Sequence, residues 1–201
     1  MADENHDPQT LAFYDREAAA YAGRRLAKSS RLTLFLAALP VGAHVLDLGC
    51  GGGQDSEVML AEGFEVTPLD GSAGLAGIAQ ARLGRPVRVQ LFEDLEDDAA
   101  FDGVWANASL LHVPTAGLPR VLARVRRALK PGGVFHASYK AGDGGGRDTL
   151  GRYFNFPSEA ELRAAYGDAG PWAALAIRQG VGHSYEQEER TWLHVAVVRP
   201  A

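Results

Sequence analysis

Cysteine is nearly absent from this chain, which contains only Cys50 among its 201 residues. A single cysteine can form no intramolecular disulfide, and it cannot supply a metal site that needs several thiolates. This composition is compatible with a reducing compartment. We expect no bound metal.

Long apolar runs are also lacking. The longest apolar region, residues 32–48, is interrupted by Pro40, Gly42 and His44, so it cannot serve as a membrane span. The first ten residues, MADENHDPQT, are polar and acidic, and they lack the basic start and apolar stretch of a secretory signal. We therefore expect a cytoplasmic protein with no membrane partner.

The chain has no excess of positive charge. It contains 20 Lys and Arg against 25 Asp and Glu, for a formal net charge of −5. This charge argues against nucleic acid as the main partner and favours a small molecule. The basic residues between Arg120 and Lys130 are typical of the solvated face and C-terminal end of a surface helix.

No Pro/Ser-rich linker divides the chain, so we expect residues 1–201 to form a single domain. Helix-like and strand-like periods alternate along it, which predicts a parallel sheet with crossover helices. The last two expected strands can pair as an antiparallel hairpin. The expected strands are residues 44–48, 64–69, 87–91, 101–107, 134–139, 172–179 and 191–198, and the expected helices are 9–27, 31–39, 54–62, 74–83, 118–129 and 158–166.

A glycine-rich turn, VLDLGCGGGQDS at residues 45–56, follows the first expected strand. Its glycines predict a ligand close to the backbone, but Gln54 stands where the dinucleotide motif GxGxxG needs its third glycine. Asp47, just before the glycines, would repel a pyrophosphate and attract a cation. S-adenosylmethionine (SAM) carries an ammonium and a sulfonium and no phosphate, so it suits this loop. Asp70 ends the second strand at the spacing typical of a ribose-binding acid.

Several segments in order resemble the class I SAM-dependent methyltransferases. VLDLGCGGGQDS resembles motif I, VTPLDGSAGLAGIAQARL the ribose-binding motif, and LFEDLED the adenine-side loop. FDGVWANASLLHVP resembles the fourth strand and its exit, and VLARVRRALKPGGVFHASYK the fifth helix and strand. The resemblance runs from about Phe13 to the C-terminus and is strongest, through WANASLLHVP, to small bacterial enzymes related to tellurite-resistance methyltransferases. Pro68 and Gly71 depart from the family pattern.

The resemblance implies an α/β, three-layer Rossmann-like methyltransferase fold with a seven-stranded mixed sheet whose last strand is antiparallel. It implies that residues 1–40 form helices that cover the cofactor site. The implied SAM-binding residues are Tyr14, Tyr21, Asp47, Gly49, Gly51, Asp70, Gly71, Asp94, Leu95 and Asn107. Glu93 is the alternative to Asp94 as the acid of the adenine pair, and Tyr14 and Tyr21 could instead be core residues of an amphipathic helix.

His112, just beyond the fourth strand, is the candidate general base, because imidazole titrates near physiological pH. The alternative is a structural histidine at a strand exit. Tyr139, Arg147, Arg152 and Tyr153 lie where this fold usually admits its acceptor. The two arginines would favour an anionic acceptor or the cofactor's carboxylate, and the alternative is a solvated glycine-rich loop with surface arginines.

The sequence thus predicts a methyltransferase that transfers a methyl group from SAM to a small molecule and releases S-adenosylhomocysteine. An oxygen, nitrogen, sulfur or metalloid acceptor fits the motifs equally well, and they indicate no oligomeric state. The alternatives are a non-catalytic module that binds SAM or S-adenosylhomocysteine, and an NAD-dependent oxidoreductase. An Asn/Asp-Pro-Pro-aromatic stretch, typical of DNA amino-methyltransferases, does not follow the fourth strand.

Overall fold

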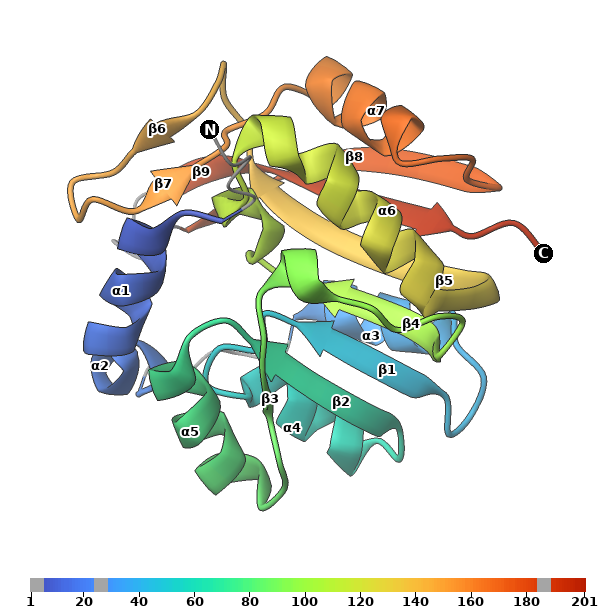
Figure 1. Ribbon diagram of the computed structural model, residues 1–201. Coiled ribbons are helices and arrows are strands. Elements are labelled where there is room, and N and C mark those ends of the chain that lie inside the picture. The colour runs from blue at the N-terminus through green and yellow to red at the C-terminus, as the bar shows by residue number, and fades with distance from the viewer. Residues whose placement is uncertain (1–5, 24–28, 184–188) are drawn as a thin grey trace.

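A seven-stranded mixed sheet forms the centre of the protein in a computed structural model, which describes residues 6–23, 29–183 and 189–201 (Figure 1). The strand order is β3-β2-β1-β4-β5-β9-β8. The first five are parallel, and β9 is antiparallel to both of its neighbours, which confirms the predicted sheet. The strands are β1 (His44–Leu48), β2 (Glu65–Asp70), β3 (Arg88–Val89), β4 (Phe101–Ala106), β5 (Leu129–Lys140), β8 (Ala174–His183) and β9 (Glu189–Val198).

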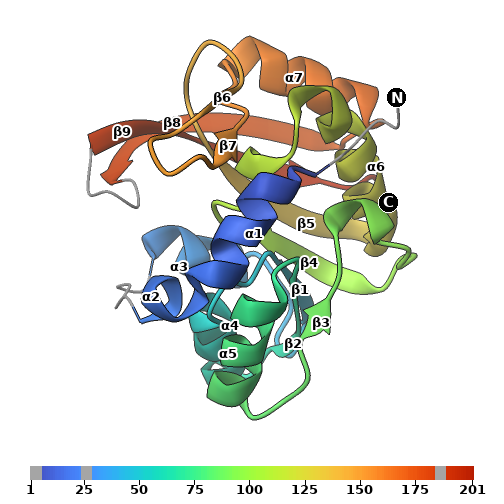
Figure 2. The same cartoon turned by 60° about the vertical axis from the view of Figure 1, so that its left-hand side comes forward.

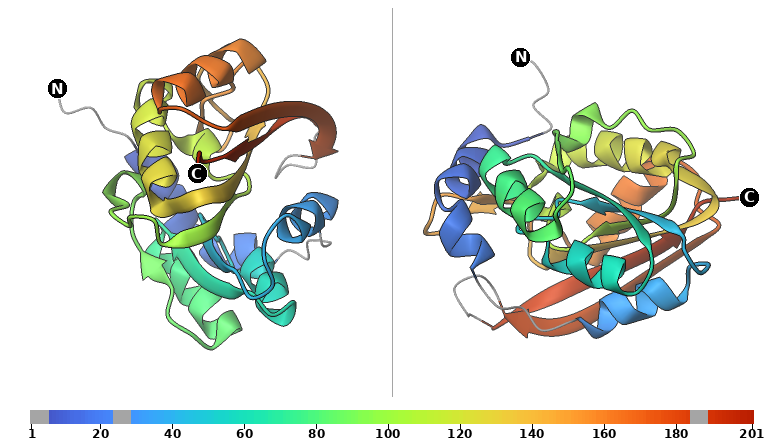
Figure 3. Two further views of the ribbon diagram at one scale, coloured as in Figure 1. Left: turned by 90° about the vertical axis from the view of Figure 1, so that its right-hand side faces the viewer. Right: turned by 90° about the horizontal axis from the view of Figure 1, so that it is seen from below.

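Helices cover both faces of the sheet and complete the three layers (Figure 3). Helices α3 (Ser30–Ala37) and α4 (Gln54–Ala61) share one core with β1, β2 and β4, and α5 (Ala73–Leu83) packs beside α4 and β2. Helices α6 (Leu118–Ala128) and α7 (Glu159–Asp168) share the larger core on the other face with β4, β5 and β9. No helix in the described ranges is both long and apolar enough to span a membrane.

The basic residues of α6 do more than face solvent. The helix buries Val121, Leu122 and Val125 against the sheet, as its amphipathic period predicts. On its other side, Arg124 donates to the carbonyl of Leu95 and Arg126 to that of Pro171. These side chains therefore tie the helix to neighbouring loops.

Two helices, α1 (Pro8–Arg16) and α2 (Ala18–Ala22), replace the single helix expected over residues 9–27. The chain bends at Glu17, and the part of the expected helix at residues 24–27 lies outside the described residues. Asp15 accepts hydrogen bonds from Ser72 Oγ at 2.6 Å and from the Gly74 amide at 3.0 Å, so α1 is fastened to the start of α5.

Other boundaries also differ from the sequence prediction. Strand β5 begins at Leu129 rather than Val134, because the chain continues through a register irregularity in which Gly132 takes a positive φ of 75°. Strand β3 has two residues where five were expected, and β8 continues to His183. A small sheet of β6 (Gly146–Arg147) and β7 (Tyr153–Phe154) forms between β5 and α7, where the sequence predicts no strand.

The parallel strands β1, β2 and β4 end at the same edge of the sheet, and α1 and α2 lie across this edge (Figure 2). In open α/β sheets, ligands bind beyond the carboxyl ends of the strands. The fold therefore places a site between this edge and the N-terminal helices.

Candidate functional site

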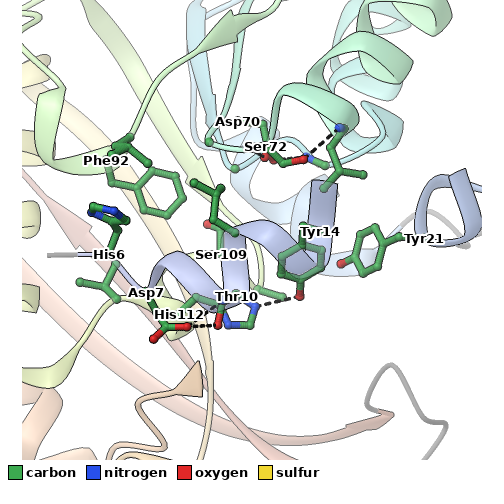
Figure 4. A pocket seen from close by; sticks show the side chains of 18 of the residues that line it. His6, Asp7, Thr10, Tyr14, Tyr21, Asp70, Ser72, Phe92, Ser109 and His112 are labelled. Atoms are coloured by element: carbon green, nitrogen blue, oxygen red, sulfur yellow. Dashed lines mark hydrogen bonds between the residues drawn. The ribbon is translucent and has the colours of Figure 1, made fainter. Parts of the chain in front are cut away.

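A pocket lies at the carboxyl ends of β1, β2 and β4, under helix α1 (Figure 4). Eight of the residues predicted from the sequence line it, and Leu11, Phe92 and Ser109 are among those that sequence reasoning missed. The pocket is lined by His6, Asp7, Thr10, Leu11, Tyr14, Tyr21, Gly49, Gly51, Asp70, Gly71, Ser72, Leu75, Leu91, Phe92, Asn107, Ala108, Ser109, His112 and Val113.

The glycine turn forms the floor of this pocket. Gly49 has a φ of 83°, and a Cβ placed on it would lie 2.4 Å from Cβ of Ser109, so a side chain here has both a strained backbone and no room. Gly51 has a φ of 56°, and a Cβ there would lie 3.6 Å from the Tyr21 ring. The turn is held by the amides of Gly49 and Cys50, which both donate to the carbonyl of Leu69.

Asp70 lies at the end of β2 and lines the pocket beside Gly71. Its carboxylate accepts hydrogen bonds from the amides of Gly51 at 2.8 Å and Ser72 at 2.9 Å. Burial nevertheless raises its pKa to about 6. The carboxylate thus joins the glycine turn to the start of α5, which places it where the sequence predicts a ribose-binding acid.

Asp47 does not line the pocket. Its side chain is buried behind the glycine turn, where Ser56 Oγ donates to it at 2.6 Å. Burial, and next the nearby carboxylate of Asp55, raises the pKa of Asp47 to about 8. Its carboxyl therefore holds a proton near pH 7, whereas the sequence predicts a charged carboxylate. Its predicted role near the amino-acid end of the cofactor stays a prediction.

Asp55 is an acid that sequence reasoning missed, although it stands in the first turn of the helix after the glycine loop. It accepts hydrogen bonds from Trp105 Nε1 at 2.7 Å and Asn107 Nδ2 at 3.2 Å. Ser138 Oγ donates to the other end of the Asn107 amide at 3.0 Å. Asp55 and Ser138 hold the two ends of the amide and so fix the orientation of Asn107, which lines the pocket at the end of β4.

The adenine-side loop differs from the expected arrangement. Asp94 and Leu95 do not line the pocket, and Leu95 is fully buried in the core under α6. Leu91 and Phe92 form the apolar wall instead. Glu93, the alternative acid, is paired with His6 at 2.9 Å.

Tyr14 and Tyr21 both line the pocket, and their rings meet edge to face with centroids 5.1 Å apart. His112 Nδ1 lies 2.6 Å from the carbonyl of Tyr153, which can only accept, so Nδ1 carries the proton. His112 Nε2 therefore accepts from the Tyr14 hydroxyl at 2.9 Å. Burial, with Arg152 and Lys140 nearby, lowers the pKa of His112 to about 4, so the ring is neutral near pH 7.

None of the four residues predicted to admit the acceptor lines the pocket. Tyr139 is buried in the core, with its hydroxyl 3.2 Å from that of Tyr166. The Tyr153 hydroxyl is 3.4 Å from Thr115 Oγ1.

Both predicted arginines already contact carboxylates. Arg147 pairs with Asp7, the N-cap of α1, at 2.6 Å, and Arg152 pairs with Asp148 at 2.6 Å. The buried Arg152 guanidinium also lies over the Phe13 ring, and its Nη1 is 3.4 Å from the Tyr14 hydroxyl. The β6–β7 segment therefore contacts α1 through both arginines and stabilises its position from outside the pocket.

Comparison with known proteins supports the fold. Residues 45–133 match a family model described as a methyltransferase domain. Over 136 residues the chain is 39% identical to a ubiquinone biosynthesis O-methyltransferase from Paramagnetospirillum magneticum, a match that covers 64% of this chain and 50% of the relative. It is 37% identical over 107 residues to an uncharacterised methyltransferase from Synechocystis, covering 52% and 50% of the two chains. The chain thus spans about half the length of the curated relatives it matches.

Solved methyltransferases share the fold. A SAM-dependent methyltransferase from Methanosarcina mazei superposes with a TM-score of 0.74 at 18% identity, covering 87% of this chain and 99% of that one. The 1,6-didemethyltoxoflavin-N1-methyltransferase of Burkholderia thailandensis, solved with S-adenosylhomocysteine, gives 0.70 at 24% identity, covering 95% and 88%. Residues 45–133 are therefore similar to a methyltransferase domain, and the chain shares the Rossmann-like fold of these solved proteins. The narrower similarity to tellurite-resistance enzymes stays a prediction.

Proposed function

We propose that this protein transfers a methyl group from SAM to a small-molecule acceptor and releases S-adenosylhomocysteine. The observation that carries the proposal is the pocket itself, in which Gly49, Gly51 and Asp70 meet under the tyrosines of the N-terminal helices. The matches to methyltransferases, one of which was solved with S-adenosylhomocysteine, support the same cofactor.

The residues of the pocket fit a cationic nucleoside. Leu91 and Phe92 offer an apolar wall to the adenine ring, and Asp70 offers carboxylate oxygens to the ribose hydroxyls. The absence of a side chain at Gly49 and Gly51 lets the ligand approach the backbone, and Tyr21 faces Gly51 across the pocket. When bound, SAM supplies an electrophilic methyl carbon on a sulfonium.

The chain's own contribution to methyl transfer is orientation and exclusion of water. Asn107, fixed by Asp55 and Ser138, borders the methionine side of the cofactor at the end of β4. Helix α1 closes the pocket, and the Tyr14–His112 hydrogen bond ties this helix to the β4 exit. Because the pKa of His112 is lowered to about 4, its Nε2 is a weak base, and we assign it a positioning role.

A small molecule is the acceptor in this proposal. The names of matched relatives, such as the ubiquinone biosynthesis O-methyltransferase, support this class. We keep the predictions of a cytoplasmic location and of no nucleic-acid partner, in line with the net charge of −5.

Isothermal titration calorimetry with SAM and, separately, with NAD tests the cofactor. We expect saturable binding of SAM and none of NAD, and the reverse result would overturn the proposal in favour of an oxidoreductase. Transfer of a labelled methyl group from SAM to a panel of phenols, amines, thiols and metalloid oxyanions tests catalysis. SAM binding without transfer to any of them would favour a non-catalytic binding module.

A further inference from the structure

Helix α3 and strands β8 and β9 extend on the face of the sheet opposite α6 (Figure 3). Two arginines and two histidines from α3, β8, β9 and β5 lie close together there: Arg31, Arg178, His194 and His136. Arg178 on β8 is directly opposite His194 on β9 in the antiparallel register. A Cβ placed on Gly180 would lie 2.7 Å from Arg31 Nη2 and 3.8 Å from His194 Nε2. The Arg31 guanidinium therefore lies close to the His194 ring.

Among the described residues, no acidic side chain pairs with the positive charges of this cluster. The guanidinium groups of Arg31 and Arg178 have no ion pair and no hydrogen bond within the part of the chain that the structure describes. The two elements that carry them, SRLTLFLA in α3 and ALAIRQGVGH in β8, contain no acidic residue. Burial, and next the charge of Arg178, lowers the pKa of Arg31. Two neighbouring cations with no counter-ion favour the binding of an anion.

His136 adds buried hydrogen-bonding groups that are unused. It is 8% exposed and stacks on Trp105, with ring centroids 4.4 Å apart, and on His194, at 5.8 Å. Both of its ring nitrogens, and Nδ1 of His194, lack a hydrogen-bond partner among the described residues. Buried polar atoms in folded proteins are nearly always paired, so these nitrogens indicate a missing partner.

Gly180 shapes the space in front of the cluster. It has an extended conformation within β8 and needs no positive φ. Its lack of a side chain leaves the room that the Arg31 guanidinium occupies, since any Cβ would displace that group. The arrangement of the two arginines therefore depends on this glycine.

We propose that Arg31, Arg178 and His194 form a binding site for an oxyanion group, a carboxylate or a phosphate. Guanidinium groups bind both through paired N–H donors with matching geometry, and a neutral imidazole adds one further donor. The site is separate from the pocket under α1, to which none of these residues belongs.

The site is linked to the pocket of the proposed function through strand β5. Ser138 is opposite His194 in the register of β5 and β9, and its hydroxyl donates to Asn107 Oδ1 at the edge of the pocket. Asn107 follows β4, two strands away from β9, a separation of roughly 10 Å. The anion site and the methionine side of the pocket thus lie on neighbouring parts of the same sheet.

Calorimetric titration with inorganic phosphate and with acetate, at ionic strength matched with NaCl, tests the site without SAM. We expect Arg31→Gln and Arg178→Gln each to weaken binding of the preferred anion roughly tenfold. Arg85→Gln, at an exposed arginine just after α5, removes the same charge elsewhere and is expected to leave binding unchanged. The anion that binds with the higher affinity shows whether the site prefers a phosphate or a carboxylate.

Gly180→Ala is the sharper variant, because it displaces the Arg31 guanidinium while every charge is kept. We expect it to weaken anion binding as well, and phosphate or acetate to shift the ¹⁵N resonances of the His194 ring in the wild type only. Equal binding by all four variants, or no binding by the wild type, would overturn the site. SAM titrations of the same samples report separately on the proposed function.

Discussion

Two regions beside the pocket under α1, which we call its glycine-turn end and its β7 end, contain buried ionisable groups of opposite sign. At the glycine-turn end, Asp47 and Asp70 are buried with hydrogen-bond donors but, within the described ranges, without an ion pair, and the pKa of each is raised. At the β7 end, Arg152 is buried against the carboxylate of Asp148. At the first end, Asp70 lines the pocket and can attract a cationic ligand, whereas at the second end the charge of Arg152 is already paired and the arginine serves to hold α1.

The largest expected effect tests the glycine-turn end. Gly49→Ala forces a side chain into a φ of 83° and to within 2.4 Å of Ser109, so we expect a loss of roughly 3 kcal/mol in the free energy of unfolding and loss of SAM binding. Urea denaturation and calorimetry with SAM measure the two effects.

Gly42→Ala is the matched control for this variant. Gly42 also has a positive φ, of 72°, but a Cβ there meets nothing within 4 Å. We expect it to cost about 1 kcal/mol and to leave SAM binding unchanged. If Gly49→Ala lowered the unfolding free energy and SAM affinity no more than Gly42→Ala, the close contact between Gly49 and Ser109 would not be important for either property.

The raised pKa of Asp47 gives the next largest effect. The carboxyl keeps its proton in the folded protein up to about pH 8 but loses it near pH 3.8 when unfolded. Its contribution to stability is therefore fully present below about pH 4 and is lost as the pH rises towards 8. The unfolding free energy therefore changes by at most about 1.4 kcal/mol per pH unit through this group.

Asp47→Asn should remove this slope, and the range from pH 7 to 8 isolates it best because Asp70, with a pKa of about 6, is largely ionised there. Urea denaturation at several pH values measures the slope, with Asp98→Asn, at an exposed acid, as the control. Equal slopes in wild type and Asp47→Asn would mean that Asp47 is already charged in the folded protein. Both ends would then contain a buried charged side chain, and the contrast between them would be smaller.

The sequence predicted the glycine-turn end better than the β7 end, for a physical reason. Gly49, Gly51 and Asp70 act through backbone conformation and strand ends, which local spacing encodes, and the structure places all three at one pocket. The sequence did not predict the contacts of Arg147 and Arg152, because each pairs with an acid that the motifs do not indicate. Arg147 pairs with Asp7, 140 residues away, and Arg152 pairs with Asp148 across a turn. Asp47 shows what could not be predicted at the glycine-turn end, because the motif gives the position of this residue in the chain but not the burial of its side chain.

The smallest effect tests whether the β7 end only holds α1. Tyr14→Phe removes the hydroxyl that His112 Nε2 accepts from, so we expect a loss of about 1 kcal/mol in unfolding free energy and a modest rise in KM for SAM. The matched control, Tyr153→Phe, removes a hydroxyl whose contact with Thr115 is long, at 3.4 Å, and it should change stability by less than about 0.5 kcal/mol. Because His112 is neutral above about pH 4, neither variant should shift the pH profile of methyl transfer between pH 6 and 8. A shift in Tyr14→Phe alone would show that His112 exchanges a proton during the reaction, and the β7 end would then be catalytic as well as structural.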